Sequence, residues 1–374
     1  MPEPEPLQQV DRTYVLRRGQ RYSYFSGCDY FRLASHPKIL AALQAGARKY
    51  GLNVAASRLT TGNHRLYREL ERELARFFEA PDALLVSTGY LGALVVVQAL
   101  TGNFSHALID EFAHPALQDA AALLACPVLK FRHHDPESVE KAVRRCGPGA
   151  RLLLLTDGLF ARDGSVAPVA DYLQVLPKDA LVLVDDAHGA GVLGKRGQGT
   201  PEYAAVSRHR VIQTVTLSKA FGVFGGAIIG SAQLRRSALR RSNLVVGSTP
   251  LPLPLAAAAL ESVKVVRQDK GLRTRLYDNS EFVKNALREL GVTLPDAPGP
   301  IIPLLPNDGR AARQMERKLI DTRIFPPFLK YPGGPPNGFF RFVLSSEHSR
   351  GQLENLVKVL TRLRRHYQAL NTGG

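Results

Sequence analysis

Cysteine is scarce in this 374-residue sequence, and long apolar runs are missing. The three cysteines (Cys28, Cys126 and Cys146) are odd in number and lack metal-ligand spacing, so we expect free thiols and no metal site. No run of about 18 apolar residues occurs, so no membrane span is expected. The first six residues (MPEPEP) lack the basic and apolar regions of a signal peptide. These absences together predict a protein of the reducing cytoplasm.

Acidic residues are outnumbered, because 33 Asp and Glu face 49 Lys and Arg, which gives a formal net charge of +16. The basic residues are dispersed, and their densest stretches lie at residues 235–241 and 362–365. No basic run is interleaved with the stacking aromatics that single-strand binders use, so we expect no nucleic-acid partner. Two interpretations of the charge stay open: a solvated basic face, or attraction of an anionic substrate such as an acyl-coenzyme A.

Short β-branched and aliphatic runs alternate with helical stretches in the first two thirds of the chain. The runs predicted to form strands are residues 83–87, 107–110, 128–131, 151–157, 180–185, 211–216 and 226–230. This alternation predicts an α/β fold with a mostly parallel, doubly wound sheet. From about residue 268 onward helices and short strands mix less regularly, as expected for a smaller α+β domain. We therefore expect an N-terminal segment (1–45), a large domain (46–267) and a small C-terminal domain (268–374).

An amphipathic helix is predicted just before the first of these strands. The apolar residues that repeat at helical spacing are Leu66, Leu70, Leu74 and Phe77. Such a stripe belongs to the core. Asn63 precedes it and has a side chain suited to cap the first turn.

Two polar motifs each close a predicted strand. Lys219 follows the strand at 211–216 within TVTLSKAFG, and Asp185 ends the strand at 180–185 within LVLVDDAHG. An open α/β sheet binds ligands at the edge where its parallel strands end. A lysine amine can form a Schiff base with an aldehyde, and a carboxylate can keep a pyridine nitrogen protonated. The pair predicts a site for pyridoxal 5′-phosphate (PLP), where Lys219 would also serve as general base or acid at an amino acid's α-carbon.

Neighbouring residues suit the other groups of this cofactor. His188 follows Asp185 closely and is placed to hydrogen-bond the phenolic oxygen of the ring. The turn that contains Thr88, Gly89 and Tyr90 leads from a strand into a helix. Backbone donors converge at a helix start and glycine permits close approach, so this turn is a candidate phosphate site. Thr216 offers a hydroxyl to the same phosphate.

Two more side chains are candidates for the site. His114 follows another predicted strand end and precedes Pro115. It could stack on the cofactor ring or cap the following helix, and its residue type alone favours neither role. Arg341 is a lone arginine in the apolar run FFRFVL. An arginine in such a run usually has a partner, and a substrate carboxylate held by two hydrogen bonds would be a suitable one.

Taken in order, these motifs resemble the α-oxoamine synthase family, PLP enzymes that have the aspartate-aminotransferase fold (fold type I). The resemblance covers nearly the whole chain. The segments that carry it are 25–30 (FSGCDY) with 35–37, 57–64 (SRLTTGNH) with 70–71, 87–90, the His114 motif, 131–135 (FRHHD), 160–168, 185–191 and the Lys219 motif. Within the family, the 8-amino-7-oxononanoate synthases are the most similar.

The resemblance implies roles for individual residues. Those that it assigns to PLP binding are Lys219, Asp185, His188, His114, Thr88, Gly89, Tyr90, Thr216 and Thr249. The first four would also be catalytic, with His114 stacked on the ring. Thr249 matches a residue that reaches the phosphate from the other subunit, which implies a homodimer with shared active sites. Arg341 matches the arginine that holds the substrate carboxylate.

The family reaction condenses an amino acid with an acyl-thioester, with loss of carbon dioxide, and gives an α-aminoketone. The resemblance favours L-alanine with pimeloyl-coenzyme A or pimeloyl-carrier protein, a reaction of biotin biosynthesis. Three departures concern the substrate: Cys28 replaces an asparagine, Ala161 replaces a serine, and residues 330–334 (KYPGG) replace Pro-Pro-Thr-Val-Pro. They leave open an aminotransferase or aldolase reaction, or a catalytically idle subunit that partners an active paralogue. The retained Lys219 argues against the idle subunit.

Overall fold

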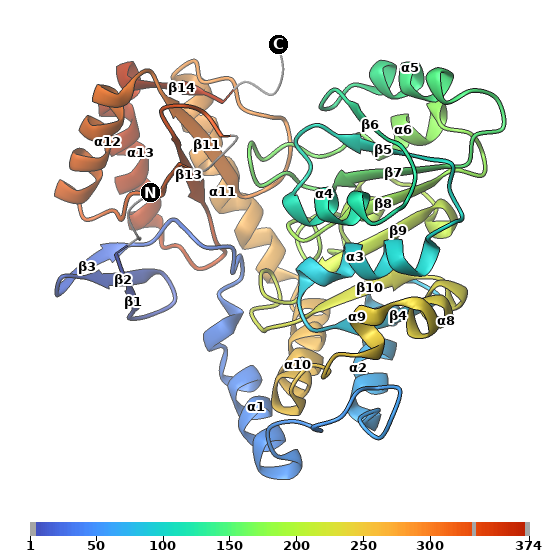
Figure 1. Ribbon diagram of the computed structural model, residues 1–374. Helices are drawn as coiled ribbons and strands as arrows, with labels where there is room; N and C mark the ends of the chain where they lie inside the picture. Colours follow the sequence, from blue (N-terminus) through green and yellow to red (C-terminus); the bar gives the residue numbers. More distant parts are fainter. Residues whose placement is uncertain (1–4, 331–333, 371–374) are drawn as a thin grey trace.

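A computed structural model gives the fold of this chain and describes residues 5–330 and 334–370. Three sheets organise these residues: a three-stranded N-terminal sheet, a seven-stranded central sheet and a four-stranded C-terminal sheet (Figure 1). The N-terminal sheet lies beside the C-terminal domain, and a parallel bridge between Ser23 and Ile324 joins the two. Of the unusual segment 330–334, residues 331–333 lie outside the described part of the chain.

The seven-stranded sheet forms the centre of the large domain. Its strands, in spatial order, are β4 (Asp82–Val86), β10 (Gly226–Gly230), β9 (Val211–Thr216), β8 (Leu181–Asp185), β7 (Leu152–Asp157), β5 (His106–Asp110) and β6 (Val128–Phe131). Neighbouring strands from β9 to β6 are parallel, whereas β10 is antiparallel to both of its neighbours. Every strand lies within one residue of its predicted bounds. The mostly parallel sheet is thereby confirmed.

Helices cover both faces of this sheet. The helices of the N-terminal two thirds are α1 (Pro37–Tyr50), α2 (Arg65–Phe77), α3 (Gly89–Leu100), α4 (Pro115–Ala122), α5 (Pro136–Cys146), α6 (Val169–Val175), α7 (Thr200–Tyr203), α8 (Ala232–Arg241), α9 (Asn243–Val246) and α10 (Leu253–Gln268). One face packs against α3, α4 and α8, and the other against α2 and α10 at one end and α5 and α6 at the other. Because both faces are buried, the central strands are continuous apolar runs such as LLLL in β7.

The predicted cap of α2 is wrong by one residue. His64 occupies the N-cap position, where its Nδ1 accepts a hydrogen bond from the Leu66 backbone N–H at 3.2 Å. The Asn63 side chain instead accepts a hydrogen bond from the Arg58 guanidinium, which also pairs with the buried Glu71. Asn63 therefore serves the buried ion pair of the preceding turn. The predicted apolar stripe of α2 is confirmed, because all four of its residues are buried.

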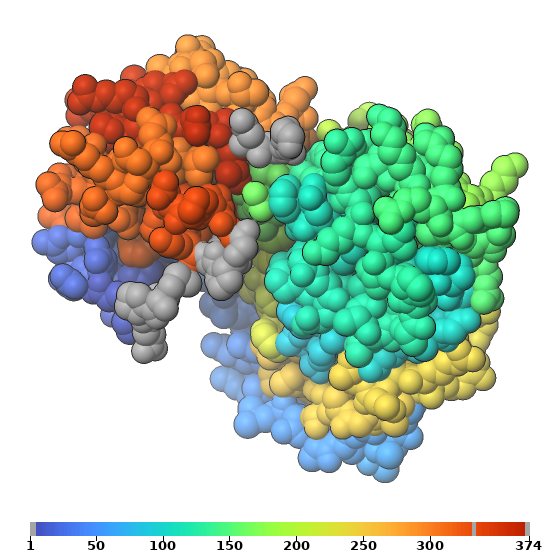
Figure 2. All heavy atoms as spheres, turned by 45° about the horizontal axis from the view of Figure 1, so that its top comes forward, coloured from blue at the N-terminus to red at the C-terminus, as the bar shows by residue number. Residues whose placement is uncertain are grey.

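The remaining elements form the C-terminal domain and the N-terminal sheet. They are β1 (Gln8–Gln9), β2 (Tyr14–Arg17), β3 (Gln20–Ser23), α11 (Gly271–Glu289), β11 (Ile301–Pro306), α12 (Gly309–Asp321), β12 (Phe328–Leu329), β13 (Phe339–Val343), α13 (Arg350–Arg362) and β14 (Tyr367–Ala369), with 3₁₀ turns at Leu33–Ser35, Arg208–Arg210 and Arg364–His366. The C-terminal sheet is antiparallel throughout and has the order β12-β13-β11-β14. Figure 2 shows the surface hollowed between this domain and the large domain.

The division at 45/46 and 267/268 stays a prediction. Helix α1 spans the first of these borders and packs along α10, and α11 begins just beyond the second. In the described ranges no helix is both long and apolar enough to cross a membrane. The three cysteines are free.

Candidate active site

Polar side chains end four neighbouring parallel strands of the central sheet. Asp110, Asp157, Asp185 and Thr216 are the last residues of β5, β7, β8 and β9. Asp157 lies directly opposite Asp185 in the register of β7 and β8. All four are buried. This edge is where a doubly wound sheet binds its ligand.

Lys219 and His188 meet at this edge. The turn after β8 carries His188 and the turn after β9 carries Lys219, which places the Lys219 Nζ 2.7 Å from the His188 Nε2. The other ring nitrogen of His188, Nδ1, lies 2.5 Å from the hydroxyl of Tyr30, a fully buried residue of the N-terminal segment. The structure therefore brings the predicted Lys219 and His188 together and adds Tyr30. The sequence motif at 25–30 contained this tyrosine but assigned it no role.

The surroundings of these groups shift their protonation. Burial lowers the pKa of Lys219, and the nearby Cys28 and Asp185 partly oppose that change. Burial, assisted by the charge of Lys219, lowers the pKa of His188 well below its ordinary value. His188 is consequently a neutral imidazole at pH 7, and the neutral amine form of Lys219 is more accessible than in water.

Asp185 shares its strand end with a second carboxyl group. Burial raises the pKa of Asp185, while Lys219 and His114 oppose the rise. Burial and the charge of Asp185 raise the pKa of Asp157 well above its ordinary value. The negative charge of the pair therefore lies on Asp185, because the pKa of Asp157 is raised well above its ordinary value. Sequence reasoning missed Asp157, whose only signal was its place at the end of the predicted strand 151–157.

His114 caps α4, because its Nδ1 accepts a hydrogen bond from the Ala116 N–H at 3.2 Å. Its backbone N–H donates to Asp157 Oδ2 at 2.8 Å, which ties the cap to the strand edge. The ring of Tyr90 packs edge-on against the imidazole, with 6.2 Å between the ring centroids, and the Tyr90 hydroxyl bonds Asp119. The capping role is thus confirmed, and stacking on a cofactor stays a prediction.

The turn into α3 forms a close-packed cradle. Thr88 is the N-cap residue, and its side chain makes no capping bond. A Cβ on Gly89 would lie 2.6 Å from the Thr216 Cβ, and a Cβ on Gly226 would lie 2.7 Å from the Gly89 Cα. Only glycine fits at these contacts, and the first N–H groups of α3 have no partner within the helix. The cradle suits an anion such as a phosphate.

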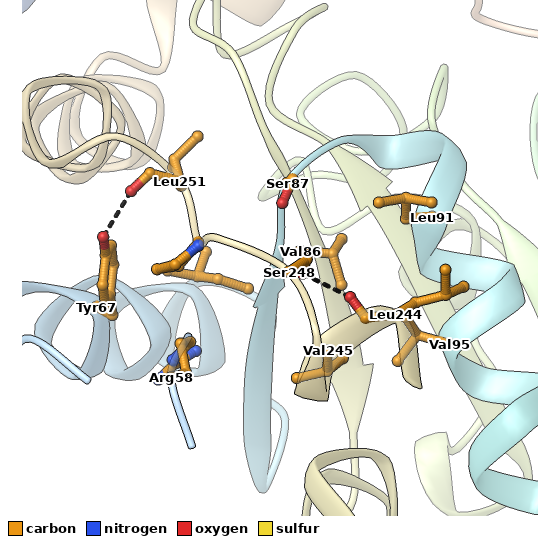
Figure 3. Close-up of a pocket in the computed structure, with 12 residues that line it drawn as sticks. Arg58, Tyr67, Val86, Ser87, Leu91, Val95, Leu244, Val245, Ser248 and Leu251 are labelled. Carbon is orange, nitrogen blue, oxygen red and sulfur yellow. Dashed lines mark hydrogen bonds between the residues drawn. The ribbon is translucent and has the colours of Figure 1, made fainter. Parts of the chain in front are cut away.

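The segment that contains Thr249 passes beside this turn. Figure 3 shows Ser87 at the end of β4, next to the chain that runs from Leu244 through Ser248 to Leu251. The Ser248 hydroxyl donates to the Leu244 carbonyl at 2.6 Å, and the Ser87 hydroxyl donates to the Thr249 carbonyl of the same chain at 3.3 Å. Thr249 therefore lies beside the phosphate cradle of its own chain. Its predicted reach into a second subunit concerns a chain that the structure does not contain.

Arg341 reaches the site from the C-terminal domain. It lies on β13, and its Nη1 donates to the Ala161 carbonyl at 3.5 Å across the boundary between the domains. Its charge is close enough to lower the pKa of both His188 and Lys219. Arg341 also lines a cleft of about 700 Å³ whose other residues include Leu7, Ile320, Phe325 and Phe328. Cys28, half-buried, lies near Lys219 and Tyr30.

A second cluster anchors the loop that carries Ala161. His133 is buried between two carboxylates, with its Nδ1 3.0 Å from Asp110 and its Nε2 3.2 Å from Asp163. Burial lowers the pKa of His133, but the hydrogen bonds that the imidazole donates to both carboxylates outweigh it and raise the pKa to about 9. Asp163 also accepts hydrogen bonds from the Ser165 hydroxyl and backbone N–H. Among the described residues no cluster of His, Cys, Asp and Glu is suited to a metal ion.

Comparison with known proteins agrees with this geometry. The family of class I and II aminotransferases matches residues 26–360. The 8-amino-7-oxononanoate synthase of Thioalkalivibrio sulfidiphilus (strain HL-EbGR7) is 35% identical over 360 residues, which cover 96% of this chain and 90% of that protein. The 8-amino-7-oxononanoate synthase 1 of Bacillus subtilis (strain 168) is 29% identical over 366 residues, 97% of this chain and 93% of that protein.

Two solved structures share the fold. The serine palmitoyltransferase of Sphingomonas wittichii has a TM-score of 0.88 at 24% identity, over 96% of this chain and 91% of that chain. The 8-amino-7-oxononanoate synthase of Francisella tularensis has a TM-score of 0.79 at 23% identity, over 92% of this chain and 98% of that chain. The chain thus belongs to the class I and II aminotransferase family and, within it, to the α-oxoamine synthases, PLP-dependent acyltransferases of fold type I.

Proposed function

We propose that this protein condenses a small L-amino acid with an acyl-thioester, as an 8-amino-7-oxononanoate synthase does in biotin synthesis. The favoured substrates are L-alanine and pimeloyl-coenzyme A or pimeloyl-carrier protein, and the products are an α-aminoketone, carbon dioxide and the free thiol. The contact of Lys219 with His188 at 2.7 Å, beside Asp185 and facing Arg341, is the observation that carries the proposal. It brings an amine, a carboxylate and an anion-binding guanidinium together in one site.

The site residues fit PLP. The α3 cradle at Gly89 would take its phosphate, the Lys219 amine its aldehyde, and His188 its phenolic oxygen. Asp185 would keep the ring nitrogen protonated, since a carboxylate at the strand edge favours the charged form of a nearby pyridinium, and the charge of Lys219 opposes the rise in the pKa of Asp185 that burial causes. When bound, PLP supplies an electron-poor ring that takes up the charge left by breaking a bond at the α-carbon.

The chain's own residues then control which bond breaks. Lys219 would take the α-proton and later return it, which is easier for an amine whose pKa burial has lowered. Arg341 would hold the substrate carboxylate by paired hydrogen bonds and so orient the α-carbon toward Lys219. The anchored loop at Ala161 would fix the position of Arg341 through their contact.

The cleft next to Arg341 would receive the acyl chain. Its volume of about 700 Å³ suits a medium chain, and most of its lining is apolar. Besides Arg341, its charged members are Glu5, Arg17 and Glu316. Arg17 is the candidate for a carboxylate at the far end of a pimeloyl group, although Glu5 pairs with it at 2.9 Å.

A homodimer is part of the proposal. Exposed large apolar side chains support it, among them Leu52, Leu59, Tyr90, Phe224 and Val246. A sedimentation-equilibrium measurement should give twice the chain mass of 40.9 kDa. A monomer at micromolar concentration would contradict shared active sites.

Release of free thiol tests the function directly. Purified protein with PLP is given alanine, glycine or serine together with pimeloyl- and palmitoyl-coenzyme A, and thiol, carbon dioxide and ketone are measured. We expect release with alanine and pimeloyl-coenzyme A in the parent and in Lys38→Ala, an exposed lysine of α1, but not in Lys219→Ala. If no pair of substrates releases thiol, the proposal is refuted. An oxo-acid formed from the amino acid alone would indicate an aminotransferase. Activity that appears only after a second gene product is added would indicate that this chain is the idle subunit.

A further inference from the structure

The hydroxyl of Tyr30 is buried against His188. Tyr30 has no exposed surface, and a tyrosine hydroxyl in that position needs a hydrogen-bond partner. The partner is the His188 Nδ1 at 2.5 Å, a contact between residues 158 positions apart. The other nitrogen, Nε2, points at the Lys219 amine. The imidazole is therefore held from both sides, with one nitrogen turned toward the site and one toward Tyr30.

His188 is a neutral imidazole at pH 7, because burial and Lys219 lower its pKa. A neutral imidazole carries one hydrogen, on either Nδ1 or Nε2, and the bond made by one nitrogen fixes the state of the other. A tyrosine hydroxyl can donate to a bare Nδ1 or accept from an Nδ1–H, whereas a phenylalanine at the same place could do neither. The direction of the Tyr30–His188 bond therefore goes together with the tautomer of His188.

We propose that Tyr30 is a positioning residue whose hydroxyl donates to the His188 Nδ1 and so keeps the hydrogen of the ring on Nε2, facing the cofactor. The phenolic oxygen of PLP is an acceptor, and it needs this N–H from His188. Cys28 lies beside the same Tyr30 hydroxyl, and its thiol is a weak donor to the tyrosine oxygen. The inference rests on the proposed PLP site but not on the identity of the amino acid or acyl donor.

The position of the ring hydrogen is the decisive measurement. In protein labelled with ¹⁵N-histidine and loaded with PLP, nitrogen NMR distinguishes a protonated from a bare ring nitrogen, and His188→Gln assigns the signals. We expect Nε2–H with a bare Nδ1 in the parent, and a mixture of tautomers in Tyr30→Phe. A His188 that carries its hydrogen on Nδ1 in the parent overturns the proposal. This outcome is measured on the parent protein alone, so it does not depend on whether Tyr30→Phe folds.

The affinity for PLP gives a second readout that does not depend on turnover. Loss of one hydrogen bond should weaken PLP binding about 10-fold in Tyr30→Phe. Tyr172→Phe is the matched control, because Tyr172 is equally buried but packs in the α5 and α6 layer, and it should leave the affinity within about 2-fold. In the double variant with His188→Gln the two losses should be far from additive, because Tyr30 acts through His188.

These readouts separate the inference from the proposed function. Additive losses, or an affinity in Tyr30→Phe equal to that of the parent, would show that Tyr30 only fills space. If the tautomer responds as expected while no thiol is released from any substrate pair, the positioning role stands and the proposed reaction fails. If PLP does not bind the parent protein, both are refuted together.

Discussion

Two buried histidines near the same edge of the sheet are in opposite states of charge. His188 lies between the Tyr30 hydroxyl and the Lys219 amine, and its pKa is lowered well below the ordinary value. His133 lies between the carboxylates of Asp110 and Asp163, and despite equal burial its pKa is raised to about 9. Burial acts in the same direction on both rings, so the partners decide the outcome.

This difference in charge gives the two histidines different roles: His188 suits the chemistry of the site, and His133 anchors a loop. A neutral ring can be a donor at one nitrogen and an acceptor at the other, which suits a site where hydrogens must be placed or moved. A charged ring between two carboxylates donates from both nitrogens and fixes two segments to each other. His133 thereby ties the end of β5 to the loop of Asp163, and this loop presents Ala161 to Arg341.

Removal of the amine beside His188 should have the largest effect. In Lys219→Ala the proposed base and the anchor for the aldehyde are both lost, so we expect kcat to fall by at least about 10³-fold. The visible absorbance of the Schiff base with Lys219 should disappear while the far-ultraviolet circular dichroism stays unchanged. Activity within 10-fold of the parent would show that another group does the work assigned to Lys219.

Neutralising the second histidine should mainly cost stability. His133→Asn leaves Asp110 and Asp163 buried without their cation, and breaking a buried charged cluster in this way costs about 3–5 kcal/mol. Urea unfolding followed by circular dichroism measures the loss. An unfolding free energy within about 1 kcal/mol of the parent would mean that His133 is not charged in the folded protein.

The same cluster predicts a pH dependence. The folded pKa of His133 is about 9 and its ordinary value is 6.5, so its stabilising contribution is complete below pH 6.5 and is lost as the pH rises through 9. The shift corresponds to about 3 kcal/mol at most. Urea unfolding between pH 6.5 and 9.5 should show this decline in the parent protein. The His133→Asn variant should lack it, and an equal decline in both would assign the effect to other groups.

Arg341 connects the surroundings of the two histidines. It contacts the carbonyl of Ala161, in the loop that His133 anchors, and its charge lowers the pKa of His188. Arg341→Lys keeps the charge but cannot bind a carboxylate by two parallel hydrogen bonds. We expect the KM for the amino acid to rise about 10- to 100-fold, with a smaller change in kcat. Initial rates at varied amino acid measure the split. A fall in kcat alone would place Arg341 in the chemical step instead of in substrate binding.

The sequence predicted the strands well because each is a short apolar run with a polar residue at its end, as in LVLVD at 181–185. It predicted Lys219, Asp185 and His188 as neighbours because parallel strands end at one edge. A local sequence pattern does not show in which direction a strand runs, so the antiparallel orientation of β10 was not predicted. Nor does it show contacts between distant segments, so the contact of Tyr30 with His188 was missed.

The smallest effect should come from the residue next to His133. His134 has a φ of 56°, in the left-handed region where asparagine is better tolerated than other side chains with a Cβ. Burial, together with the charge of His133, lowers the pKa of His134 to about 4, and its buried Nε2 has no hydrogen-bond partner among the described residues. His134→Asn should relieve both costs and raise the unfolding free energy by about 0.5–1 kcal/mol. Urea unfolding of His134→Asn and His133→Asn side by side tests this, because the same substitution at adjacent histidines should change the unfolding free energy in opposite directions. A lower unfolding free energy in both variants would show that His134 also anchors the loop.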